Sequence, residues 1–238
     1  YDDAIKYFRR LQREADGQQD LGTVARAQLS VTNALLERRS YEPYINDAPL
    51  YTDANDALLA ARRARDLDLE LEALRLLGEV LMSEQPERAR THVDTCIEQA
   101  GKSKRPLALS KCLWIRGRLL ADSDPVGAQR AIDQAIALLQ YEDGADHGLL
   151  AYAWRHGMRI AWQIQSTDAA ISTGKRALAA IERLRDLQPG LESRAAAFST
   201  WTQDYYWLSG QILRLAYDAP RITDESGETR IRALLDEG

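Results

Sequence analysis

The chain has 238 residues, of which 45% are hydrophobic and 28% charged, a mixture typical of a globular protein and not of a disordered or fibrous one. Its formal net charge of -5 predicts that it binds neither nucleic acid nor an acidic membrane surface. No apolar run reaches the roughly 20 residues that span a bilayer, so we expect no membrane segment. The start at Tyr1 does not look like a signal peptide, although export directed from before residue 1 stays open.

The sequence predicts an all-α fold. Apolar residues recur three and four positions apart, and Ala, Leu, Arg, Glu and Gln dominate where strands would show alternating β-branched residues. The seven prolines lie between the periodic stretches and not inside them.

The predicted helices repeat with a period near 40 residues. The segment 76–81 (LLGEVL) is echoed by 115–120 (IRGRLL), 39 residues later, and then by 155–160 (RHGMRI) and 208–213 (LSGQIL). We therefore expect one continuous domain, residues 1–238. It begins with an isolated helix over 1–16 and continues with four helix hairpins over 20–67, 69–101, 105–140 and 148–187. A final helix over 191–217 and a tail over 218–238 complete it.

Each copy has a first helix with a central glycine, such as Gly78 or Gly117. Its second helix carries a small residue, a larger apolar residue and another small residue at i, i+4 and i+7, as in Ala128, Ile132 and Ala135. Small residues let two antiparallel helices approach closely. This pattern resembles the tetratricopeptide repeat, which implies a right-handed α-solenoid.

The first hairpin contains an irregular connection. We expect helices over Leu21–Arg39 and Thr52–Asp66, joined by a loop over 40–51 with two prolines and three tyrosines. The loop either packs on its own repeat or forms a binding loop.

The last third of the sequence has a more specific resemblance than the repeats before it. Residues 177–213 resemble the final tetratricopeptide-like repeat that precedes the caspase-like CHAT peptidase domain of bacterial proteins, with Ile181–Arg185 in the long helix and Ser193–Tyr206 in the aromatic one. Arg230–Asp236 is similar to the arginine-rich helix that leads into the peptidase. The resemblance implies that the peptidase's His and Cys lie beyond Gly238 and that this chain is a regulatory or scaffold segment.

The residues offer no coherent enzyme site. Cys96 takes the place that Ala135 holds in the next unit, so we expect a small buried residue there, and we expect Cys112 also to be buried and reduced. Two unpaired cysteines favour the cytoplasm. We predict no catalytic residues, because no nucleophile, base and third group occur together.

No cofactor or metal is expected either. The three histidines lack the spacing of a helical metal site, and the glycines recur at packing positions, which is not the pattern of a phosphate loop. Asp143, Asp146 and His147 fit a solvated turn better than a cation site.

The strongest candidate binding surface is a row of side chains on the first helices. Trp114, Trp154 and Trp207 each stand three residues before the repeat glycine, and Arg75 takes that position in the earlier unit. A second set of side chains stands one residue after each of these glycines. Such a row suits capture of a peptide in a concave groove. Packing between neighbouring repeats is the alternative. The expected groove comprises Arg75, Glu79, Trp114, Arg118, Trp154, Met158, Trp207 and Gln211.

We therefore expect a non-catalytic solenoid that recognises a protein or peptide. The alternative is the small-ligand or peptide sensor segment of a bacterial transcription or signalling regulator. Aromatic residues on the final helix, Trp201, Tyr205 and Tyr206, cover the end of the repeats or form a homodimer contact there.

Overall fold

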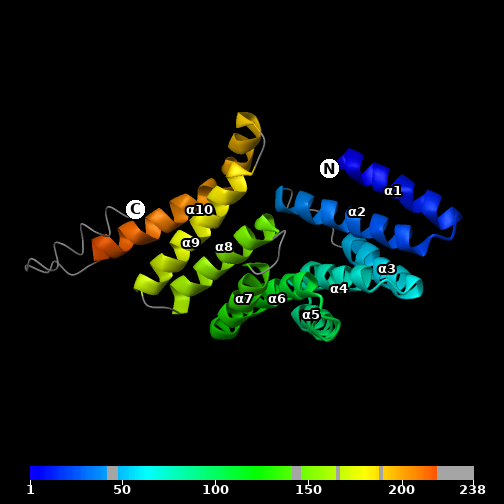
Figure 1. The fold of residues 1–238 in the computed structure, drawn as a ribbon, viewed down its shortest axis with the longest axis horizontal. Coiled ribbons are helices and arrows are strands. Elements are labelled where there is room, and N and C mark those ends of the chain that lie inside the picture. The colour runs from blue at the N-terminus through cyan, green and yellow to red at the C-terminus, as the bar shows by residue number, and fades with distance from the viewer. Residues whose placement is uncertain (42–47, 141–145, 165–166, 188–189, 219–238) are drawn as a thin grey trace, which may run out of the picture. The chain divides into compact units, whose positions relative to one another are not determined.

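The computed structural model describes residues 1–41, 48–140, 146–164, 167–187 and 190–218. Within these ranges every regular element is an α-helix, and from α1 to α7 and again from α8 to α10 each helix packs against the next (Figure 1). The predicted all-α helical-repeat fold is confirmed.

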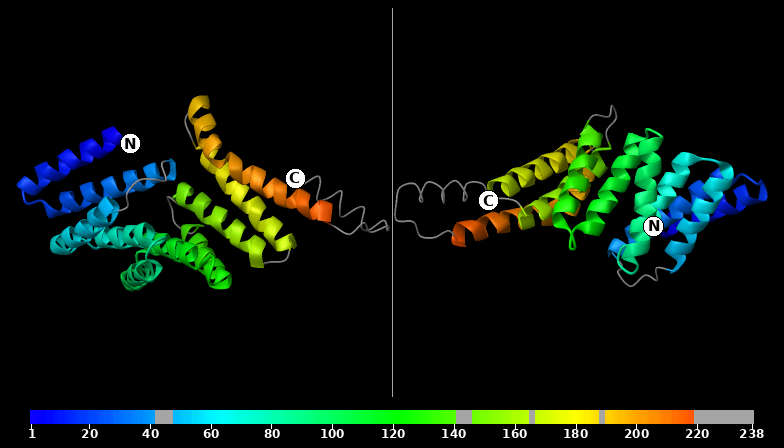
Figure 2. Two further views of the ribbon diagram at one scale, coloured as in Figure 1. Left: turned by 180° about the vertical axis from the view of Figure 1, so that it is seen from behind. Right: turned by 90° about the horizontal axis from the view of Figure 1, so that it is seen from below.

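The contacts divide the chain into two compact units, Tyr1–Glu142 and Asp143–Gly238. Helix α1 lies along α2, and α9 contacts both α8 and α10 (Figure 2). The helices of the first unit are α1 (Asp2–Gly17), α2 (Leu21–Tyr41), α3 (Ala48–Ala64), α4 (Leu67–Leu81), α5 (Pro86–Lys102), α6 (Pro106–Leu120) and α7 (Pro125–Gln140). Those of the second are α8 (His147–Ile164), α9 (Thr167–Asp186) and α10 (Leu191–Asp218).

Local sequence fixes where the helices of the first unit begin. The Asp66 side chain accepts a hydrogen bond from the Leu69 amide at 3.1 Å, which caps α4. Pro86 and Pro106 start α5 and α6, where the missing amide hydrogen costs nothing. Lys104 adopts a left-handed φ of 54° just after α5, which lets the chain turn toward α6.

The repeat glycines bring the two helices of a hairpin together. A Cβ atom on Gly78 of α4 would lie 2.3 Å from Val93 Cγ2 of α5, and one on Gly117 of α6 would lie 2.6 Å from Ile132 Cδ1 of α7. Only glycine permits this approach, and the branched side chain of the second helix fills the space. The close glycine contact predicted from the sequence is present in both hairpins.

An apolar cluster and a group of charged side chains stabilise the second unit. Asp204 of α10 is fully buried, and its Oδ1 accepts hydrogen bonds from Arg155 Nε at 2.9 Å and from Arg159 Nη2 at 3.0 Å, both on α8. These guanidinium groups lie over the rings of Trp201 and Trp207, 5.5 and 5.2 Å from the ring centres. The apolar cluster is formed by Met158, Ile171, Ala177, Leu208 and Ile212.

Part of the connection predicted over 40–51 is helical. Helix α3 begins at Ala48, and Pro49 fits its first turn because that position needs no amide hydrogen. Leu50 is fully buried, so packing extends the helix past the expected start at Thr52. Residues 42–47 lie outside the described ranges.

The cysteines differ from the sequence prediction. Both are buried as expected, but Cys96 of α5 and Cys112 of α6 form a disulfide, with their Cα atoms 6.2 Å apart. The prediction of two reduced thiols is therefore wrong: packing of α5 against α6 places the two residues face to face, although 16 positions separate them in sequence. The argument for a cytoplasmic location from unpaired cysteines loses its basis.

The helices in the described ranges lack the combination of length and apolar character needed to cross a bilayer.

Candidate functional site

A pocket of about 420 Å³ lies in the first unit, where α4 meets the connection between α5 and α6 and the start of α6. Its lining carries four cationic side chains and two carboxylates, next to an aliphatic wall. The cations are Arg75, Lys104, Arg105 and Lys111; the carboxylates are Asp68 and Glu72; the wall is formed mainly by Leu71, Pro106, Leu107 and Ala108.

Helical spacing gathers the α4 members on one side of that helix. Asp68, Glu72 and Arg75 stand at i, i+4 and i+7, so their side chains lie one above another along the helix. The turn at Lys104 then brings Arg105 and the first turn of α6 against them.

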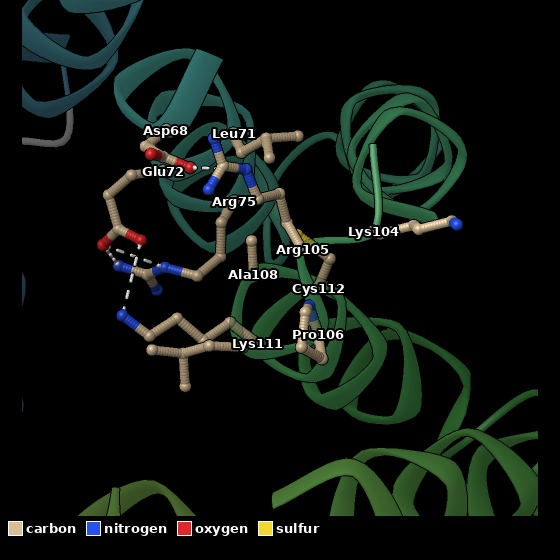
Figure 3. Close-up of a pocket in the computed structure, with 11 residues that line it drawn as sticks. Asp68, Leu71, Glu72, Arg75, Lys104, Arg105, Pro106, Ala108, Lys111 and Cys112 are labelled. Carbon is tan, nitrogen blue, oxygen red and sulfur yellow. Dashed lines mark hydrogen bonds and ion pairs between the residues drawn. The ribbon is translucent and has the colours of Figure 1, made fainter. Parts of the chain in front are cut away.

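Charged side chains from two helices meet at Glu72. Arg75 Nη2 donates to Glu72 Oε1 at 2.8 Å, and Lys111 Nζ lies 3.7 Å from Glu72 Oε2. Figure 3 shows Arg75 and Lys111 converging on this carboxylate, with Arg105 directed at Asp68 and Lys104 extending away from the other charges. Arg105 Nε lies 3.4 Å from Asp68 Oδ1, in a pair that is more than half exposed.

Burial and charge act in opposite directions on the acids of this region. Burial alone raises the pKa of Glu72, but the nearby Arg75 and Lys111 outweigh it and hold the pKa below its ordinary value. The pKa of Glu79 is lowered in the same way by Arg75 and Arg118 against burial. Both carboxylates are therefore charged at neutral pH.

The four candidate groove residues of this unit are brought together. Arg75 Nη1 donates to Glu79 Oε2 at 2.8 Å, the same carboxylate accepts a hydrogen bond from Arg118, and the Arg118 guanidinium lies 4.9 Å from the centre of the Trp114 ring. Arg75 Nη2 also donates to Asn33 Oδ1 on α2 at 3.2 Å. One chain of contacts thus crosses α2, α4 and α6, and Arg75, whose side chain is 9% exposed, lies at its centre.

The four candidates of the second unit lie in a different environment. Met158 is fully buried, and Trp154 and Trp207 pack against the apolar cluster around it. The Arg176 guanidinium of α9 lies 5.9 Å from the centre of the Trp154 ring. Gln211 is half-buried on α10. These tryptophans are partly buried and contribute area to the core of their unit.

Two charged residues of the pocket and the asparagine that binds Arg75 were missed by the sequence analysis, although a signal was present. Asn33, Glu72 and Lys111 are spaced 39 residues apart, the same period that relates the repeat glycines. They occupy equivalent positions on α2, α4 and α6, three residues before the predicted row. Extending the repeat alignment to polar positions would have identified them.

The acidic stretch before α8 is partly described. Asp146 caps that helix, since its Oδ1 accepts a hydrogen bond from the Leu149 amide at 2.9 Å, and His147 is the first helical residue. Asp143 lies outside the described ranges. Among the residues with described positions, no three His, Cys, Asp or Glu side chains gather as metal ligands.

No protein-family model matches the chain, and comparison with curated proteins gives no matching sequence.

Proposed function

We propose that the chain is a non-catalytic recognition protein whose first unit binds an acidic segment of a protein partner. The observation that carries this proposal is the pocket between α4 and α6, which four cationic side chains and two carboxylates line beside an aliphatic wall. The excess of positive charge in an otherwise acidic chain favours a negatively charged ligand.

The cations at the mouth of the pocket are available for exchange. Exposed ion pairs such as Arg105 with Asp68 contribute only about 0–1 kcal/mol, so a ligand carboxylate can replace the internal partner at little cost. The ion pair of Lys111 with Glu72 is long, at 3.7 Å, and an ammonium group has three donors, so Lys111 can also bind a ligand carboxylate. Behind them, the buried Arg75 is paired with Glu72 and Glu79 and fixes the position of these two carboxylates.

The aliphatic wall suggests the ligand's second feature. Leu71, Pro106 and Leu107 line the pocket next to the cations. An acidic residue followed by an apolar one would place its carboxylate on Lys111 or Arg105 and its apolar side chain against this wall. We therefore expect a preference for Asp or Glu next to Leu, Ile or Phe.

A small acidic molecule is the second candidate ligand. The volume of about 420 Å³ lies within the range of small-molecule sites, which favours the sensor alternative. A dicarboxylate that competes with peptide binding at low concentration would support that alternative.

The resemblance to the tetratricopeptide-like region of CHAT-domain proteins favours an accessory role for this chain. In that arrangement the chain is the regulatory or scaffold segment of a bacterial protein, and any peptidase chemistry lies outside it. Binding at the first unit would then bias the conformation of an attached peptidase domain.

Selection from a random decapeptide library tests the proposed function. We expect enrichment of peptides that carry an acidic residue beside an apolar one, and loss of that enrichment in the Arg105→Gln, Lys111→Gln double variant. Arg130→Gln, an exposed change on α7 that does not line the pocket, is the matched control. Enrichment without acidic residues would contradict the proposal.

A further inference from the structure

In α4 and α6, the first helices of two hairpins, the repeat glycine is covered by the next helix in sequence. Above Gly78 and Gly117 lie the branched side chains of Val93 and Ile132, as described for the two hairpins of the first unit. The flanking positions are also covered: Leu74, four residues before Gly78, is 1% exposed.

Helix α10 has the same pattern, but none of the residues that the structure describes covers its glycine. A Cβ atom on Gly210 would meet nothing within 4 Å. Tyr206, four residues before it, is 75% exposed, Leu213, three residues after it, is 47% exposed, and Tyr217 is 89% exposed. The position equivalent to Tyr206 is thus almost fully buried in α4 and open in α10.

These four residues form one stripe along α10. Their spacing of four, three and four residues places them on a single face, opposite the buried Asp204, Leu208 and Ile212. Large exposed apolar stripes of this kind mark interaction surfaces, and tyrosine is a residue that interfaces favour.

We infer that the stripe Tyr206, Gly210, Leu213 and Tyr217 is the contact of a homodimer in which the α10 helices of two copies pack antiparallel. The spacing is symmetric about its midpoint, so a two-fold axis there places Gly210 opposite Leu213 of the partner subunit. Tyr206 then faces Tyr217 of the partner subunit.

This pairing reproduces the glycine contact of the hairpins. A branched leucine enters the open space above Gly210, as Val93 and Ile132 do above Gly78 and Gly117. The tyrosine pairs close both ends of the contact. The stripe is therefore complementary to itself, which an isologous dimer requires.

Sedimentation equilibrium of the full chain tests the inference. We expect a dimer, and we expect Gly210→Gln to raise its dissociation constant about tenfold or more, since the added side chain fills the space that the leucine needs. Gly210 is exposed, so this change does not disturb the fold. Gly101→Gln on α5, also in open space, is the matched control and leaves the dimer unchanged.

A chain that stays monomeric at about 100 μM would overturn the inference and leave the stripe to another occupant. A dimer that Gly210→Gln does not weaken would overturn it too, because the contact would then lie elsewhere.

Cross-linking determines the register independently. The native cysteines are already paired with each other, so introduced thiols report only on the new contact. We expect a disulfide-linked dimer under mild oxidation when Gly210→Cys and Leu213→Cys chains are mixed, and little from either chain alone. Efficient cross-linking of Gly210→Cys with itself would overturn the antiparallel arrangement.

Discussion

Arg75 Nη1 lies 2.8 Å from Glu79 Oε2 on the same helix, and the Glu79 carboxylate also accepts a hydrogen bond from Arg118 on α6. The two cations share one acid across neighbouring repeats. Through Arg75, the network also includes Glu72 and Asn33, so charged and polar side chains connect α2, α4 and α6 beside the pocket.

Replacing the central arginine should therefore destabilise the fold. We expect Arg75→Met to lower the free energy of unfolding by about 3 kcal/mol, because Glu72 and Glu79 stay partly buried with fewer cationic partners. Arg116→Met, which breaks an exposed 3.5 Å pair with Asp94, should cost less than about 1 kcal/mol. Urea unfolding of the three chains measures the difference.

The same network predicts a pH dependence. The pKa values of Glu72 and Glu79 are lowered on folding, so their contribution to stability is complete above about 4.3, the value for an unfolded glutamate, and is lost as the pH falls through their folded pKa values. Without Arg75, both acids lose the charge that lowers their pKa most, so both pKa values are higher than in wild type. The stability difference between wild type and Arg75→Met should hence be largest near neutral pH and shrink below pH about 4. A constant difference between pH 7 and 3 would show that the lost interaction is not electrostatic.

The repeat glycines give a third prediction. Gly117→Ala should destabilise the chain by about 1–3 kcal/mol, because the new methyl group would lie 2.6 Å from two atoms of Ile132. Gly101→Ala in open space should instead stabilise it by about 0.5–1 kcal/mol through helix propensity. Thermal unfolding monitored by circular dichroism distinguishes the two signs, and equal effects would argue against the close α6–α7 contact.

The disulfide between Cys96 and Cys112 gives a fourth prediction. Its 16-residue separation predicts that reduction, or Cys96→Ala with Cys112→Ala, lowers the free energy of unfolding by about 3 kcal/mol. Mass spectrometry after alkylation under denaturing, non-reducing conditions reports whether the bond is present in the purified protein. Two alkylated thiols would restore the sequence prediction of reduced cysteines.

Sequence periodicity predicted the helical fold and the close contact within two of the hairpins. The glycine at one register predicted close packing, and Gly78 and Gly117 show it because each faces a small residue and a branched one on the next helix. The same pattern failed at Gly210, which lies exposed on α10. The position of the repeat glycine shows which face of a helix is suited to close packing. It does not show whether another helix lies against that face.

The site was harder to predict for two physical reasons. Arg75 and Trp114 hold equivalent positions in the sequence, yet Arg75 is buried among carboxylates while Trp114 lies under a guanidinium, because partners from adjacent helices decide each environment. Cys96 was correctly placed in the core from its repeat position. Its bond to Cys112 depends on the distance between two helices, which sequence spacing does not give.

Calorimetric titration with a peptide from the selection tests the central claim most directly. We expect wild type to bind the acidic peptide, and both its Glu→Gln analogue and the Arg105→Gln, Lys111→Gln variant to bind at least about tenfold more weakly, since hydrogen bonds to charged groups contribute about 1.5–3 kcal/mol each. Equal affinities in all three titrations would contradict recognition of an acidic segment by this pocket.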